Sequence, residues 1–260
     1  MQKVYVNVDC ANIYRDNAFR SAIDSQAVLW EELKVKTKEK QFSLVVCEDS
    51  YQGWINNNQI NPASINNPKE MVTCNHAFIY EEADENTLTV REAGAGCYIP
   101  ILRQINGWYQ IILPDGEKGW IKRSVFDKIS GDQNKNMLVL AKRFLGVPYF
   151  WGGKTAKGLD CSGFCQLLHK MVGIKIRRDS PMQFEDAQMV SDNFLDGTPG
   201  DLLFFAEYGE RITHVALKLS EKEIIHARGR VRINSLDKDS ELFDSKLIDT
   251  FVAVKTFFDR

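Results

Sequence analysis

Cys161 lies in the stretch GLDCSGF, where a glycine-marked turn meets the start of an apolar helical pattern. Asp160, directly before it, is of the residue type that commonly caps the first turn of a helix. The unpaired N–H groups and the dipole at a helix start favour an anion, which lowers the pKa of a cysteine thiol. The same N–H groups can hold a developing oxyanion. The pattern therefore favours a nucleophilic role for Cys161 over simple burial.

A nucleophilic cysteine needs a base, and the sequence has four histidines. His76 lies in the first half of the chain, and His169 is about 12 Å along the predicted helix from Cys161. The other two lie in the runs HVALKL and EIIHA, which a short polar connection separates. In a hairpin, the numbers of facing residues there would sum to about 440 to 442. Either register brings His214 and His226 together, so that one can take the thiol proton and the other can orient it.

A zinc site is the competing interpretation of these residues. Cys161, Cys165 and His169 follow each other at four-residue steps, and His214 could complete a tetrahedral set. Structural zinc sites usually place paired cysteines on loops, at shorter spacings. We therefore expect no metal and no cofactor, and we assign Cys165 to the core.

Composition limits the partners of the protein. The chain has 260 residues, a net charge of −2 and no block rich in lysine or arginine, so we expect no nucleic-acid partner. Its apolar runs are too short to cross a bilayer, so we expect no membrane partner. The start, MQKVYVNVD, lacks the plan of a secretory signal, which predicts a cytoplasmic protein whose cysteines are thiols. The oligomeric state is left open.

The first half of the chain repeats. VDCANIY and VTCNHAFIY end 66 residues apart, and so do YQGWI and EKGWI. A shared offset at both ends of a unit indicates a repeated fold. Short runs rich in Val, Ile, Tyr and Trp alternate with Gly, Asn and Asp, so each copy is predicted to be a small all-β barrel of about five strands. The predicted domains are residues 1–66 and 67–128.

The pattern changes after a polar stretch that follows Phe126. MLVLAKRFLG and CSGFCQLLHKMVG have apolar residues at helical spacing and end at glycines. DLLFFA, HVALKL, EIIHA and TFVAVKTFF are then predicted to be short strands. Helices followed by an antiparallel sheet indicate an α+β domain over residues 129–260.

Six segments of this second half are, in chain order, PYFWGG, GLDCSGF, RDSPMQ, TPGDLLFF, HVALKL and EIIHARG. Together they resemble the NlpC-type branch of papain-like cysteine peptidases, which hydrolyse bonds in bacterial cell-wall peptides. The resemblance implies Cys161 as the nucleophile, His214 as the general base and His226 as the orienting residue. It also implies that Tyr149 lies near the oxyanion and that Trp151 belongs to a loop that shapes the cleft.

The two N-terminal barrels resemble bacterial SH3-like domains, so the expected fold is two SH3-like barrels followed by an α+β papain-like (NlpC-type) catalytic domain. This order of domains resembles the γ-D-glutamyl-L-diamino acid endopeptidases. Those enzymes cut murein peptides that have a free N-terminal L-alanine, between D-glutamate and the diamino acid. The expected partner is therefore a murein tripeptide or longer stem peptide, with either lysine or diaminopimelate.

In that group an acidic pocket binds the substrate amine and a barrel wall narrows the cleft. Asp160 is the predicted amine ligand, with Ser162 and Ser180 at matching motif positions. A plain N-cap is the alternative role for Asp160, and two carboxylate oxygens could serve both. Tyr51 is the candidate from the first barrel. One further barrel acid is expected as a ligand, and Asp16 and Asp24 are the two candidates.

The apparent lack of an export signal favours recycling of imported murein peptides over wall building. Two alternatives stay open. One is an amidase or acyltransferase of the same fold, and the other is a non-catalytic protein that binds wall peptides.

Overall fold

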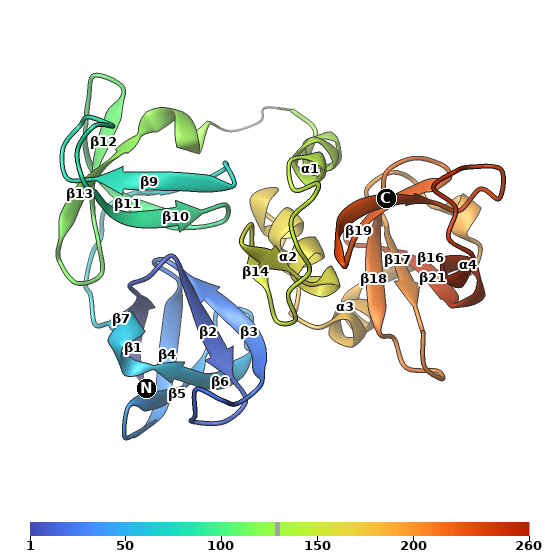
Figure 1. Ribbon diagram of the computed structural model, residues 1–260, viewed down its shortest axis with the longest axis horizontal. Coiled ribbons are helices and arrows are strands. Elements are labelled where there is room, and N and C mark those ends of the chain that lie inside the picture. The colour runs from blue at the N-terminus through green and yellow to red at the C-terminus, as the bar shows by residue number, and fades with distance from the viewer. Residues whose placement is uncertain (128–130, 260) are drawn as a thin grey trace. The chain divides into compact units, whose positions relative to one another are not determined.

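The computed structural model describes residues 1–127 and 131–259 and divides into two compact units, Met1–Lys128 and Ile129–Arg260 (Figure 1). The first unit is all-β and the second is α+β, as predicted. The predicted boundary after residue 128 lies outside the described residues. None of the described helices has the length and apolarity needed to span a membrane.

The first unit contains two antiparallel sheets. One has the strand order β3-β2-β6-β5-β4-β1-β7, and the other has the order β10-β9-β13-β12-β11-β8. The bounds of the first set are Gln2–Val6 (β1), Cys10–Tyr14 (β2), Ile23–Val28 (β3), Glu32–Glu39 (β4), Phe42–Val46 (β5), Gln52–Asn56 (β6) and Ile60–Asn61 (β7). Those of the second are Lys69–Met71 (β8), His76–Tyr80 (β9), Thr89–Gly94 (β10), Tyr98–Ile105 (β11), Trp108–Ile112 (β12) and Lys118–Lys122 (β13). Each sheet has more strands than the five expected for a barrel, and the additional ones include the short edge strands β7 and β8.

The sequence repeat appears in the structure as equivalent strand pairs. In the first sheet Tyr14 pairs with Trp54, and in the second Tyr80 pairs with Trp120. A glycine precedes each tryptophan, and a Cβ on either glycine would approach an isoleucine side chain to 2.4 Å. Both sheets therefore need glycine at the same point, where two strands come close together. The predicted repeat is confirmed.

The two sheets share part of their core. Val28, Leu29 and Trp30, which follow or end β3, belong to the same apolar cluster as the buried side chains of the second sheet. Trp30 Nε1 donates a hydrogen bond to the carbonyl oxygen of Ile112 at 2.9 Å. The predicted division of this unit into two barrels at residue 66 stays a prediction.

The second unit has one six-stranded antiparallel sheet, in the order β16-β21-β17-β18-β19-β20. Its strands are Gln188–Ser191 (β16), Leu202–Phe205 (β17), His214–Lys218 (β18), Glu223–Arg228 (β19), Arg230–Ser235 (β20) and Phe251–Thr256 (β21). A small hairpin joins Lys154–Thr155 (β14) to Gly158–Leu159 (β15). The helices are Gln133–Lys142 (α1), Cys161–Met171 (α2), Ser180–Asp186 (α3) and Ser245–Asp249 (α4).

Helix α2, which the apolar pattern of the sequence predicted, positions Cys161. Its apolar residues at helical spacing, among them Phe164 and Leu168, are buried, and the helix contacts β18 and β19. It ends just before Gly173, whose φ of 87° suits the left-handed conformation that stops helices. The first residue of α2 is thereby placed beside the hairpin that carries the two histidines.

Candidate active site

Cys161 begins α2, and Asp160 is the N-cap of that helix, as predicted. Asp160 Oδ1 accepts a hydrogen bond from the backbone N–H of Gly163 at 2.7 Å. The backbone N–H of Val215 hydrogen-bonds to the Cys161 thiol. Since Val215 follows His214 on β18, this contact places the sulfur beside the histidine hairpin.

The expected lowering of the Cys161 pKa is wrong. Burial, followed by the charge of Asp160, raises the pKa of the Cys161 thiol to about 12. The Val215 and Ser162 N–H groups oppose this, but desolvation of the thiolate is the larger effect. The helix start therefore does not produce a standing thiolate, and the proton must pass to a base as the sulfur attacks.

The histidine hairpin has the predicted topology. Strands β18 and β19 pair Leu217 with Ile225 and Lys218 with Ile224, which is the register whose numbers sum to 442. In that register His214 and His226 are diagonal neighbours rather than directly opposite. Their rings meet, with His214 Nε2 2.7 Å from His226 Nδ1.

Asn234 extends this chain of contacts and was not predicted. It lies on β20, which the sequence analysis missed, and pairs with Ile224 of β19. Its Oδ1 is 2.9 Å from His226 Nε2, and its Nδ2 donates to the Leu242 carbonyl oxygen at 3.0 Å. An asparagine in an alternating run carries no local signal for this role, because only the pairing of β20 with β19 brings it to the histidine.

Both histidines of the hairpin are neutral at neutral pH. Burial lowers the pKa of His226 to about 4, and it lowers the pKa of His214 well below the ordinary value. The charges of Arg228 and Arg232 act in the same direction on both rings. A neutral imidazole can accept a proton, so the pair can supply the base that Cys161 needs.

Buried neutral histidines make the fold sensitive to acid. His169, also buried in α2, has a pKa of about 4, against 6.5 for an ordinary histidine. Between pH 6.5 and 4 such a histidine is protonated in the unfolded state but stays neutral in the folded state. The free energy of unfolding should therefore fall by about 1.4 kcal/mol per pH unit for each such histidine between pH 6.5 and 4.

Urea unfolding at pH 7, 6 and 5 measures this fall. A His169→Gln variant should show a shallower pH dependence, by about the share of one histidine. The control variant is His76→Gln, which replaces an exposed histidine of the first unit. Equal unfolding midpoints at pH 7 and pH 5 would contradict the burial of neutral histidines.

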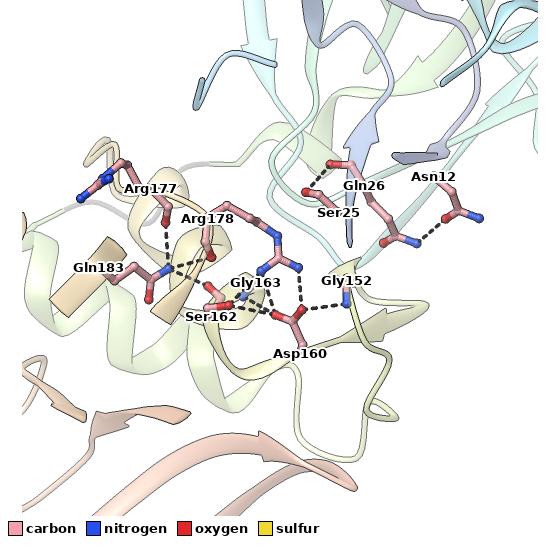
Figure 2. Close-up of polar contacts among 10 residues, drawn as sticks. All are labelled: Asn12, Ser25, Gln26, Gly152, Asp160, Ser162, Gly163, Arg177, Arg178 and Gln183. Atoms are coloured by element: carbon pink, nitrogen blue, oxygen red, sulfur yellow. Dashed lines mark hydrogen bonds and ion pairs between the residues drawn. The ribbon is translucent and has the colours of Figure 1, made fainter. Parts of the chain in front are cut away.

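Asp160 is the centre of a buried polar network (Figure 2). Its Oδ1 accepts from Gly163 N, from Ser162 Oγ at 3.3 Å and from Arg178 Nη1 at 3.0 Å. Its Oδ2 accepts from Gly152 N at 2.8 Å and from Arg178 Nη2 at 2.6 Å. Arg178 is only 1% exposed, so this is a bidentate ion pair removed from water.

These contacts leave little room for Asp160 to act as the predicted ligand of the substrate amine. Two carboxylate oxygens offer about four acceptor positions, and five protein donors already use them. An ammonium group could reach Asp160 only by displacing one of these donors. The structure thus supports the alternative, a cap, and adds Arg178 as its partner. Arg178 is the first residue of the segment RDSPMQ, which also contains Ser180, but the sequence did not indicate that it reaches Asp160.

The loop between α1 and β14 carries the two aromatic residues of the predicted cleft. Tyr149 is partly buried; burial, then the charges of Cys161 and Asp160, raise its pKa, so the phenol keeps its proton and can donate a hydrogen bond. Trp151 is 66% exposed. The next residue, Gly152, is tied to Asp160, which fixes the loop against the start of α2.

Ser162 and Ser180 are both buried near this network. Ser180 begins α3, and Gln183 of the same helix donates from Nε2 to the Ser162 carbonyl oxygen at 3.0 Å. Asp179 is the N-cap residue of α3, but its side chain makes no capping hydrogen bond. The two predicted serines thus belong to segments that are hydrogen-bonded to each other.

The predicted residues of the first unit have local partners. The Tyr51 carbonyl oxygen accepts from Cys47 N, Asp24 pairs with Arg15 at 2.8 Å, and Asp16 accepts from Ser21 Oγ at 3.0 Å. Whether Tyr51, Asp16 or Asp24 contacts a substrate stays a prediction.

The residues of the competing zinc interpretation are not arranged as a metal site. Within residues 1–127 and 131–259, no group of three or more His, Cys, Asp or Glu side chains could hold a metal ion. Cys165 is fully buried, and His169 Nδ1 lies 2.7 Å from its carbonyl oxygen.

Comparison with known proteins agrees with the site. The NlpC/P60 family matches residues 146–248. A gamma-D-glutamyl-L-lysine dipeptidyl-peptidase of Bacillus cereus (strain ATCC 10987 / NRS 248) is 29% identical over 79% of this chain and 67% of its own. The protein of the same name from Bacillus subtilis (strain 168) is 27% identical over 80% of this chain and 73% of its own.

Among solved structures, the crystal structure of an NlpC/P60 family protein from Bacillus cereus ATCC 10987 superposes with a TM-score of 0.85. The two chains are 22% identical, and the match covers 99% of this chain and 100% of the other, so it establishes the fold. A cysteine at a helix start beside a pair of strand histidines defines the class, a cysteine peptidase. Residues 146–248 form the NlpC/P60 domain of this enzyme.

Proposed function

We propose that the protein hydrolyses the bond between γ-D-glutamate and an L-diamino acid, lysine or diaminopimelate, in murein peptides with a free N-terminal L-alanine. The observation that carries the chemistry is the 2.7 Å contact between His214 and His226 beside the Cys161 thiol. Two Bacillus relatives are named gamma-D-glutamyl-L-lysine dipeptidyl-peptidase, and this name supports the choice of bond.

The reaction then follows cysteine-peptidase chemistry. His214 takes the Cys161 proton as the sulfur attacks the γ-carbonyl carbon of D-glutamate. The N–H groups at the start of α2 and the Tyr149 hydroxyl hold the oxyanion. His214 returns the proton to the leaving amine, which releases the diamino acid and leaves a thioester on Cys161. Water, deprotonated by His214, hydrolyses the thioester.

Recognition of the alanine amine needs a carboxylate other than Asp160. Five protein donors already use the oxygens of Asp160. Asp179 is a partly exposed carboxylate that lies between Arg178, the partner of Asp160, and the buried Ser180. We therefore assign the amine to Asp179, with the Ser162 and Ser180 segments and Trp151 around it. Tyr51 is kept as the proposed contact from the first unit.

Cleavage of two tripeptides tests this function. L-Ala-γ-D-Glu-L-Lys should release free lysine, whereas its N-acetyl form should be cut at least about 100-fold less efficiently, because it has no ammonium group to pair with the Asp179 carboxylate. Asp179→Asn should raise KM for the free peptide and reduce the difference between the two peptides. Equal cleavage of both peptides by the wild-type enzyme would refute recognition of the amine, and release of no lysine would refute the proposed bond.

We also propose a role in recycling murein peptides, since the proposed substrate is a small soluble peptide with an exposed amine. The cytoplasmic location expected from the sequence is part of this proposal. Fractionation of the source cells, followed by detection of the protein, tests it.

A further inference from the structure

We infer that Asn234 is a positioning residue that sets the tautomers of both site histidines, and thereby makes Nδ1 of His214 the nitrogen that accepts the thiol proton. This inference rests on the proposed function for its catalytic consequence. It also makes a statement about the resting protein that does not depend on any substrate.

The chain of hydrogen bonds starts at a backbone carbonyl. The Leu242 carbonyl oxygen can only accept, so the group 3.0 Å from it must be the Asn234 NH₂. This fixes the orientation of the amide and turns its Oδ1 toward His226. Since Oδ1 can only accept, the His226 Nε2 at 2.9 Å must carry a hydrogen.

The remaining hydrogen positions in this series of hydrogen bonds follow from the neutral charge of the two histidines. Burial keeps His226 neutral, so a hydrogen on Nε2 leaves a lone pair on Nδ1. His214 Nε2, 2.7 Å away, must then donate its own hydrogen to that lone pair. His214 is neutral for the same reason, so its lone pair is on Nδ1. That nitrogen is the one that His226 does not engage.

The opposite arrangement fails at both ends. If the amide were turned over, Oδ1 of Asn234 would face the Leu242 carbonyl oxygen, acceptor against acceptor. Each hydrogen bond in the series would then change direction, and both histidines would adopt the other tautomer. His214 Nδ1 would carry a hydrogen and could not take a proton from Cys161. Asn234 is 8% exposed and His226 is fully buried, so water cannot readily repair the lost bonds.

The charged groups around the rings affect protonation, not the choice of tautomer. Arg228 on β19 and Arg232 on β20 lower the pKa of both histidines, and Asp244, before α4, raises that of His226. None of these charges donates to or accepts from the ring nitrogens in the hydrogen bonds described, which involve only His214, His226 and Asn234.

Two substitutions at one position separate orientation from packing. Asn234→Leu keeps the side-chain volume and removes the acceptor. It should lower kcat about 100-fold to 10⁴-fold, in the range seen when a site histidine is held in the wrong tautomer, with KM changed less than about threefold. Asn234→Asp keeps the acceptor oxygen for His226 and loses the donor to the Leu242 carbonyl oxygen, so the variant should be less stable while kcat near pH 8 stays within about tenfold of wild type. Its added charge should move the acidic limb of the pH profile of kcat to higher pH.

The direct readout is the nitrogen NMR spectrum of histidine-labelled protein without substrate. Both His214 and His226 should show the Nε2–H tautomer in the wild-type protein and in Asn234→Asp. Asn234→Leu should show a new Nδ1–H population. A wild-type His226 in the Nδ1–H form, or an Asn234→Leu variant with unchanged tautomers, overturns the inference. If Asn234→Leu does not fold, the tautomers seen in the wild-type and Asn234→Asp spectra still test the inference. Failure of the tripeptide assay with correct tautomers counts against the proposed function alone.

Discussion

Replacing Cys161 with alanine should abolish release of lysine from L-Ala-γ-D-Glu-L-Lys, with a fall in kcat of at least about 10⁴-fold, while the protein stays folded. The reason is chemical, because the variant has no atom at that position that can form an acyl bond. Because burial raises the pKa of Cys161 to about 12, the thiol is neutral at pH 7, so the substitution removes no buried charge and should change the stability only slightly.

Cys165→Ala is the matched control. Cys165 lies one turn further along α2, is also buried, and loses the same atom. Its replacement should leave a small cavity and an almost unchanged kcat. Steady-state assays of both variants, with circular dichroism to verify folding, give the comparison. A Cys161→Ala enzyme with wild-type turnover would eliminate the thioester route.

The second large effect is on stability. Arg178→Met should lower the free energy of unfolding by about 3–5 kcal/mol, because it leaves the Asp160 carboxylate buried without its partner. Both side chains are almost removed from water, at 1% and 9% exposure, and their atoms meet at 2.6 Å. Urea unfolding at pH 7 measures the change.

Two further variants identify the cause. Arg177→Met removes the neighbouring arginine, whose partners Glu185 and Asp186 are exposed, and should have a far smaller effect. Adding Asp160→Asn to Arg178→Met should recover part of the lost stability, since the unpaired charge is then gone. If Arg178→Met and Arg177→Met destabilise equally, the buried pair does not have the role assigned to it.

Several parts of the site could be predicted because local sequence determines them. An aspartate before a cysteine at the start of an apolar helical pattern defined the cap and the first residue of α2. A short polar connection between two apolar runs limited the hairpin to two registers, and both bring His214 and His226 together. Turn and cap geometry act over a few residues, so such features are visible without the fold.

The remaining parts depend on contacts between distant segments. Arg178 reaches Asp160 from 18 residues away, and Asn234 reaches His226 only through the pairing of β20 with β19. The pKa of Cys161 was predicted in the wrong direction because the helix start is local, whereas burial is a property of the whole unit. Desolvation outweighs a helix dipole when the thiol is this far from water.

The mass of the enzyme quenched in acid during turnover of L-Ala-γ-D-Glu-L-Lys shows which atom carries the acyl group. We expect an L-Ala-γ-D-Glu thioester on Cys161, and none on the other five cysteines, Cys10, Cys47, Cys74, Cys97 and Cys165. A His214→Ala enzyme should accumulate no such adduct, because the thiol then lacks its base. An acyl group on a different residue, or lysine release while Cys161 is never acylated, would contradict a thiol nucleophile served by the histidine hairpin.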